Sequence, residues 1–127
     1  MVKFRDILTS GMSLAREGNY VQALSELGNG LKLAIDNDEQ MWIVHFSRNA
    51  GLICSMLGEL KKAESYYKLT LKYKDDGPTI YYVLAELYEQ MDQKSLSLSY
   101  FNSCYKLALK SNDREMLEVL QTKGIKG

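Results

Sequence analysis

Apolar residues recur every three or four positions along most of this chain, and no stretch alternates apolar and polar residues with period two. In the first such segment, Phe4, Ile7, Leu8 and Leu14 fall on one face of a helix. Spacing of this kind is typical of amphipathic α-helices, whereas a half-buried strand would alternate. The chain is therefore predicted to be all-α and to contain no strand.

Start and stop signals divide this pattern into about seven helices. Gly18 ends the first helix, because glycine readily takes the left-handed conformation that closes a helix, and Gly58 breaks a later segment into a hairpin. Asn37 is expected to cap the third helix, with Gln40 reaching back to it as in a capping box. Pro78 suits the first position of the fifth helix. The predicted helices span about residues 2–15, 20–35, 38–57, 60–74, 78–91, 94–110 and 113–123.

Two glycines lie inside the second predicted helix. Gly28 and Gly30 each cost about 1 kcal/mol relative to alanine in a helix. The apolar spacing continues through both of them, so we expect the helix to remain intact. Gly30 is expected to permit close packing against a neighbouring helix.

A shared pattern appears when the hairpins are aligned on their turns. A small residue stands where the two helices of a hairpin cross, another small residue lies in the return helix, and large residues fill the space between them. The third hairpin reads Tyr81-x-x-Leu84-Ala85-x-x-Tyr88 and Ser97-x-x-x-Phe101, the second Ser47-x-x-Ala50-Gly51-x-x-Cys54 and Ala63-x-x-x-Tyr67, and the first Ile7-x-x-Ser10-Gly11-x-x-Leu14 and Ala23-x-x-x-Leu27.

This pattern resembles the tetratricopeptide repeat, in which a period of about 34 residues combines a large residue, Leu-Gly, an aromatic residue, and then a small and an aromatic residue. The step from Ala63 to Ser97 is 34 residues, whereas the step from Ala23 to Ala63 is 40. We attribute the longer step to an early start of the helix that carries Trp42. The proline that often closes such a repeat is absent from all three hairpins.

The resemblance implies an α-solenoid of antiparallel helix hairpins, a right-handed superhelix, formed as a single domain over residues 1–127. The three repeats would span about residues 4–37, 38–77 and 78–111. The tail segment NDREMLEV, Asn112 to Val119, parallels NDEQMWIV, Asn37 to Val44. The last helix, at about 113–123, is therefore interpreted as the first helix of a shortened fourth repeat that caps the stack.

Charge and composition exclude several classes of protein. Lysine plus arginine equals aspartate plus glutamate at 16 each, so the basic excess of a nucleic-acid-binding protein is lacking. No apolar run approaches the roughly 18–20 residues of a membrane span, and the N-terminus lacks the apolar core of a signal peptide. We expect a cytoplasmic protein. Cys54 and Cys104 are interpreted as buried reduced thiols, with a disulfide or a metal site as the alternatives.

Candidate catalytic chemistry is sparse. His45 is the single histidine, and no second metal ligand stands beside it at helical spacing, so neither a zinc site nor a histidine-based triad is expected. Glu86 and Glu89 form an acid pair on an open helix face, with no sign of the burial that would shift a pKa. No phosphate-binding or nucleophile motif is present. The sequence predicts no enzymatic activity, no cofactor and no metal.

The resemblance also implies a binding surface, because in proteins with this repeat the first helices of the hairpins line a concave groove that holds an extended or helical partner segment. The concentration of Met, Leu, Tyr and Arg at the corresponding positions favours a binding surface over a merely solvated face. The candidate partner-binding residues are Arg5, Leu8, Met12, Arg16, His45, Arg48, Asn49, Leu52, Met56, Tyr82, Val83 and Glu86.

One known use of such a groove is disfavoured. The clamp with which some family members hold a chaperone's C-terminal carboxylate requires lysines, an arginine and asparagines at defined positions, and here only Asn49 fits. Trp42 is expected to pack against the end of the preceding helix, with ligand contact as the alternative.

The predicted function is that of a protein-interaction adaptor or scaffold that binds a peptide segment of a partner protein in the groove. Arg16, His45 and Arg48 beside Leu52, Met56 and Tyr82 favour an acidic segment with an apolar or aromatic anchor. The alternative is a structural repeat unit that self-associates into a homo-oligomer and leaves the groove without a ligand.

Overall fold

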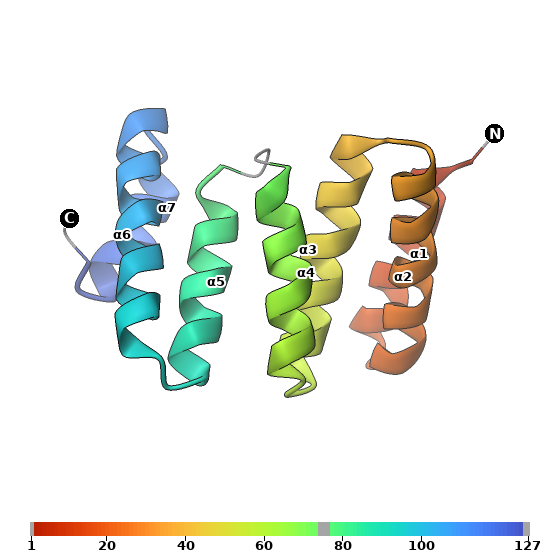
Figure 1. Ribbon diagram of the computed structural model, residues 1–127, viewed down its shortest axis with the longest axis horizontal. Helices are drawn as coiled ribbons and strands as arrows, with labels where there is room; N and C mark the ends of the chain where they lie inside the picture. The colour runs from red at the N-terminus through yellow and green to blue at the C-terminus, as the bar shows by residue number, and fades with distance from the viewer. Residues whose placement is uncertain (1, 74–76, 126–127) are drawn as a thin grey trace. The chain divides into compact units, whose positions relative to one another are not determined.

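The computed structural model describes residues 2–73 and 77–125, and these residues form seven helices and no strand (Figure 1). The chain divides into two compact units, Met1–Asp75 and Asp76–Gly127. The single-domain organisation expected from the sequence stays a prediction.

The first unit contains four helices, and each packs on the next. They are α1 (Phe4–Arg16), α2 (Tyr20–Asp36), α3 (Gln40–Met56) and α4 (Leu60–Lys72). Three-residue connections join successive helices, so neighbours run antiparallel, as Figure 1 shows. α1 also contacts α3.

The second unit contains α5 (Thr79–Gln90), α6 (Lys94–Ser111) and the short α7 (Arg114–Thr122). α5 packs on α6, and α6 packs on α7. Leu120 of α7 is fully buried beside Ala85, Phe101 and Cys104. The last helix therefore covers the apolar side of α6, as expected of a capping helix.

One turn geometry ends six of the seven helices. Each of these helices is followed by a residue with positive φ, and the next residue donates its backbone N–H to a carbonyl five positions earlier, which is the Schellman arrangement. In the first turn, for example, Asn19 N–H donates to Leu14 O at 2.8 Å. The residues with positive φ are Gly18, Asp38, Gly58, Asp92, Asn112 and Gly124.

The capping box predicted at the start of α3 is wrong. Glu39, not Asn37, is the N-cap, and it makes no side-chain capping hydrogen bond. The Asn37 side chain instead donates to Leu33 O of the preceding helix at 2.7 Å. Asn37 is the C-cap residue of α2, and Asp38, in the left-handed conformation, forms the turn that follows it. A true side-chain cap occurs at α7, where Asp113 Oδ1 accepts from Met116 N–H at 3.1 Å.

The extra length between the first and second hairpins is not confined to one helix. α2 and α3 each have 17 residues, whereas α4 has 13 and α5 has 12. The early start expected of the helix that carries Trp42 is confirmed, because α3 begins 11 residues before Gly51, whereas α5 begins six residues before the equivalent Ala85. In addition, α2 extends 13 residues past Ala23, whereas α4 extends nine residues past Ala63. Both helices are longer by about one turn, which keeps them matched in length.

The small residues of the repeat pattern lie where helices approach closely in the first unit. A Cβ at Gly11 would lie 2.7 Å from Leu27 Cδ2, and a Cβ at Gly30 would lie 2.5 Å from Phe46 Cε1. Contacts this short require a glycine. The close packing predicted at Gly30 is confirmed, and the glycines inside α2 do not interrupt that helix.

The interior of each unit holds one free, buried cysteine, Cys54 and Cys104. Burial raises the pKa of the Cys54 thiol. Burial, with a smaller effect of Asp113, raises the pKa of the Cys104 thiol to about 11. Both side chains are thus protonated at neutral pH and pack as small apolar groups, as the sequence predicted.

Candidate protein-interaction surfaces

The first candidate surface lies on α1 and α3 of the first unit. On α1, the exposed Arg5 and Arg16 flank the half-buried Leu8 and Met12, which pack against the core. Their spacing of three or four residues places all four on one side of the helix. The sequence-predicted row on α1 is therefore a continuous stripe with an apolar centre and basic ends.

The row on α3 is more open. The side chains of Leu52 and Met56 are 36% and 64% exposed, and both lie in line with half-buried His45 and Asn49 at helical spacing. The opposite side of α3 supplies buried core residues such as Ala50 and Cys54. Two apolar side chains thus reach solvent at the C-terminal end of a helix whose other face is fully used for packing.

An aromatic cluster closes the N-terminal end of the same helix. The Trp42 ring stacks on Phe4 of α1 with 5.8 Å between centroids, and it lies 5.7 Å from His45 and 6.0 Å from Phe46. Trp42 thus packs within the protein, but its stacking partner is on α1 and not at the end of the preceding helix, α2, where the sequence analysis placed it. Its stacking partner on α1 was missed, because Phe4 and Trp42 are distant in sequence and only the contact between helices brings them together.

Two polar residues of these rows have local partners. Asn49 Nδ2 donates to His45 O at 2.8 Å, so this amide is bound to its own helix. Arg16 donates to the exposed Ser13 Oγ at 3.2 Å. An exposed hydrogen bond of this kind contributes little to stability, so the Arg16 guanidinium can exchange it for another acceptor.

The second candidate surface lies in the second unit and contains the remaining sequence-predicted residues, half-buried Tyr82, Val83 and Glu86. The Tyr82 ring meets Phe101 of α6 edge to face at 5.8 Å. Burial, followed by the charge of Glu86 and a hydrogen bond to it, raises the pKa of Tyr82 to about 12. The phenol therefore stays protonated and donates to the Glu86 carboxylate.

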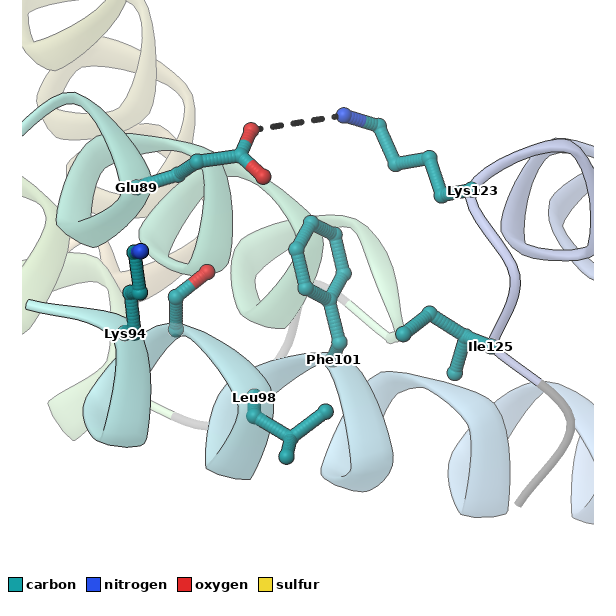
Figure 2. A pocket seen from close by; sticks show the side chains of 7 residues that line it. Glu89, Lys94, Leu98, Phe101, Lys123 and Ile125 are labelled. Atoms are coloured by element: carbon teal, nitrogen blue, oxygen red, sulfur yellow. Dashed lines mark ion pairs between the residues drawn. The ribbon is translucent and has the colours of Figure 1, made fainter.

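Lys123, which follows α7, is a member of this second surface that the sequence analysis missed. Its Nζ lies 3.5 Å from Glu86 Oε2 and 3.7 Å from Glu89 Oε1. The same atom lies 5.7 Å from the centroid of the Tyr82 ring and 5.3 Å from that of Phe101. Figure 2 shows Lys123 reaching towards Glu89 above the Phe101 ring. No sequence signal distinguishes this lysine from the others near the C-terminus.

A cavity of about 350 Å³ adjoins Lys123. Phe101, Leu98 and Ile125 provide its apolar walls, and Glu89 and Lys94 stand at its edge (Figure 2). The cavity is large enough for an aliphatic side chain. An apolar space therefore lies next to the acidic and aromatic groups that surround Lys123.

The described residues provide neither a metal-binding cluster nor a membrane-spanning helix. The described residues include no cluster of three or more His, Cys, Asp or Glu side chains suited to hold a metal ion. Within residues 2–73 and 77–125 we find no helix with the length and apolar character that a bilayer crossing demands.

Comparison with known structures identifies the class of fold. The tetratricopeptide-repeat domain of Arabidopsis FLU superposes with a TM-score of 0.78 at 18% identity, covering 85% of this chain and 95% of that one. The Yersinia enterocolitica type III secretion chaperone SycD, in complex with a peptide of the translocator YopD, superposes with a TM-score of 0.70 at 16% identity, covering 95% and 94%. The chain thus has the tetratricopeptide-repeat fold, an all-α solenoid of helix hairpins, as the sequence resemblance implied.

The chain also has a relative in sequence. The photosystem I assembly protein Ycf3 of Rippkaea orientalis (strain PCC 8801 / RF-1) is 29% identical over 94 residues, which are 74% of this chain. The chain spans about half the length of this curated relative. No protein-family model matches the sequence.

Proposed function

We propose that this chain is a protein-interaction adaptor and that the α1–α3 surface binds a segment of a partner protein. The observation that carries the proposal is the exposure of Leu52 and Met56 on α3. These two residues are neighbours one helical turn apart, and neighbouring exposed apolar side chains bounded by polar residues are typical of an interaction site. The peptide bound to SycD and the assembly role in the name of Ycf3 support a protein-binding role.

The chemistry of the rows favours an acidic partner segment with an apolar anchor. Arg5 and Arg16 lie at the two ends of the α1 stripe, and both are exposed. A carboxylate of the partner can pair with such a guanidinium, while an apolar side chain packs on Leu52 and Met56. Charge pairs at the edge would set the rate and the orientation of binding, and the apolar anchor would supply most of the affinity.

A displayed random-peptide library provides the ligand for a direct test. We expect selection on the immobilised chain to enrich peptides in which acidic residues flank an apolar or aromatic residue. Selected peptides without acidic enrichment would contradict the proposed ligand class.

Matched surface variants then locate the site. Met56→Glu on α3 should weaken binding of the selected peptide at least about tenfold, as expected for a hot-spot residue. Val21→Glu is the control, because Val21 is 76% exposed on α2, outside the proposed surface. Arg16→Glu is compared in the same way with Lys32→Glu, a charge reversal at an exposed position of α2. Equal losses in the proposed surface and on α2 would place the site elsewhere.

The self-association alternative is tested on the same protein samples. Analytical ultracentrifugation of the wild type over a range of concentrations should give a monomer if the adaptor proposal holds. A concentration-dependent dimer that Met56→Glu abolishes would assign the α3 surface to self-association instead.

A further inference from the structure

The ammonium group of Lys123 is surrounded by acidic and aromatic side chains, as the ammonium group of a bound ligand would be. Two carboxylates, from Glu86 and Glu89, lie within 3.7 Å of its Nζ, and two aromatic faces, of Tyr82 and Phe101, lie within 5.7 Å. Carboxylates combined with aromatic faces are a favourable environment for an ammonium group, because charge pairing and cation–π attraction act together.

The three residues Lys123, Gly124 and Ile125 form the turn that closes α7, and they contact this region. Lys123 pairs with the acidic and aromatic groups, while Ile125 packs against the core cluster and lines the adjoining cavity. Gly124, with φ +80°, lies between them in the left-handed turn that closes α7. Figure 2 shows the Lys123 and Ile125 side chains entering the region from the same side of the Phe101 ring.

The Lys123 side chain can leave this region without unfolding a helix. Lys123 lies beyond Thr122, the last residue of α7. The backbone N–H groups of residues 123–125 donate to Leu120 O and Gln121 O at 3.0 Å, and these hydrogen bonds stay in place when only the side chain moves. The Lys123 side chain is 29% exposed, and the side chains of Glu86 and Glu89 are 45% and 61% exposed. The site is therefore accessible from solvent.

We propose that Tyr82, Glu86, Glu89 and Phe101 form a site for a basic side chain of a partner protein, and that Lys123 occupies it as an internal competitor. The occupant is a partner segment of the form Lys-x-aliphatic, because the chain's own Lys123-Gly124-Ile125 presents this chemistry to the same groups. The site deepens the proposed function by naming a ligand for the second unit. It uses no residue of the α1–α3 surface, so either proposal can fail alone.

The test uses full-length chains and a synthetic peptide that copies residues 121–125, acetyl-QTKGI-amide. Its binding is followed by NMR through the ring resonances of Tyr82 and Phe101. If Lys123 occupies the site about nine-tenths of the time, its removal raises the apparent peptide affinity about tenfold. We therefore expect Lys123→Gln to bind the peptide about tenfold more tightly than the wild type.

Lys106→Gln is the matched control. Lys106 is exposed on α6, and its loss changes the net charge equally. It does not line this cavity and, among the described residues, forms no ion pair with Glu86 or Glu89. This variant should bind the peptide within about twofold of the wild type if the Lys123 contact decides occupancy. The same peptide with glutamine in place of its lysine should not bind to Lys123→Gln.

Several results would overturn the proposal. They are equal peptide affinity of the wild type and Lys123→Gln, equal binding of the lysine and glutamine peptides, or a wild-type dimer formed by exchange of residues 123–125. If Lys123→Gln does not fold, the wild type is titrated to excess peptide. Displacement should then shift the Lys123 side-chain resonances, and unchanged resonances would refute the site.

Discussion

Gly51 of α3 lies against the ring of Tyr67 of α4, so closely that a Cβ on Gly51 would stand 2.5 Å from Tyr67 Cε1. Tyr67 is 1% exposed and has no room to retreat. The glycine is therefore required by the distance between the two helices.

Gly51→Ala should destabilise the chain, because either the buried ring or the helices must move. Overpacking of this kind costs about 1–3 kcal/mol, and the measurement is urea unfolding followed by circular dichroism. Gly28→Ala is the control, since Gly28 lies within α2 and its added Cβ meets nothing within 4 Å. That variant should gain about 0.4–1 kcal/mol. A harmless Gly51→Ala would show that α3 and α4 are further apart than described.

The capping role of α7 can be tested at neighbouring positions. Leu120 is fully buried and Val119 is 41% exposed. Leu120→Ala should lower the free energy of unfolding by about 2–5 kcal/mol, the range for a large-to-small change in a core. Val119→Ala should change it by less than about 0.5 kcal/mol. Equal small effects in thermal unfolding would mean that α7 is a tail that contributes nothing to the core.

Two buried hydroxyl groups link α3 and α4. Ser47 Oγ and Thr70 Oγ1 are 2.6 Å apart, and each also reaches a backbone carbonyl of its own helix, Val44 O at 3.3 Å and Tyr66 O at 3.0 Å. Ser47→Ala and Thr70→Val should each cost about 1 kcal/mol. Because both changes remove the same contact, the double variant should cost less than the sum of the two. Additive losses in a double-mutant cycle would show that the hydroxyls do not interact.

Because the pKa of Tyr82 is raised, the free energy of unfolding is expected to fall at alkaline pH. Its pKa is raised from 10.0 to about 12 in the folded chain, so between these values the folded state holds more protons than the unfolded state. The stabilisation is complete below pH 10 and is lost as the pH rises towards about 12.

Tyr82→Phe removes the titrating hydroxyl while keeping the ring. Its free energy of unfolding should fall less steeply between about pH 10 and about pH 11 than that of the wild type. Cys104 also titrates in this range, and its charge contributes to the raised pKa of Tyr82, so both proteins are compared with Cys104 replaced by alanine. Parallel pH profiles would exclude Tyr82 as a contributor.

The helices and their packing could be predicted because both depend on local patterns. Apolar spacing located all seven helices. The repeat pattern marked the close contacts of Gly11 and Gly51, and the glycine inside the second predicted helix marked that of Gly30. The turn at Asp38 could not be predicted with equal success. Aspartate takes the left-handed conformation less readily than glycine, so the sequence favoured the capping box that the structure contradicts.

The candidate surfaces were predictable only as rows of residues. Helical spacing suffices to place Leu52 and Met56 on one side of α3. The position of Lys123 depends instead on where the end of α7 lies relative to α5, which is a tertiary relationship with no periodic signal. For this reason the acidic and aromatic environment of Lys123 emerged only from the structure.

The repeated left-handed turn restricts how this chain can be lengthened. Only three residues join α2 to α3. If α2 gains one helical turn at its C-terminal end, α3 must therefore gain one turn at its N-terminal end, or the added turn of α2 has no helix beside it. Both helices have 17 residues, which satisfies this condition. An engineered insertion in a hairpin should therefore be tolerated as a matched pair of whole turns. The three-residue connection is too short to accommodate an insertion in only one of the two helices.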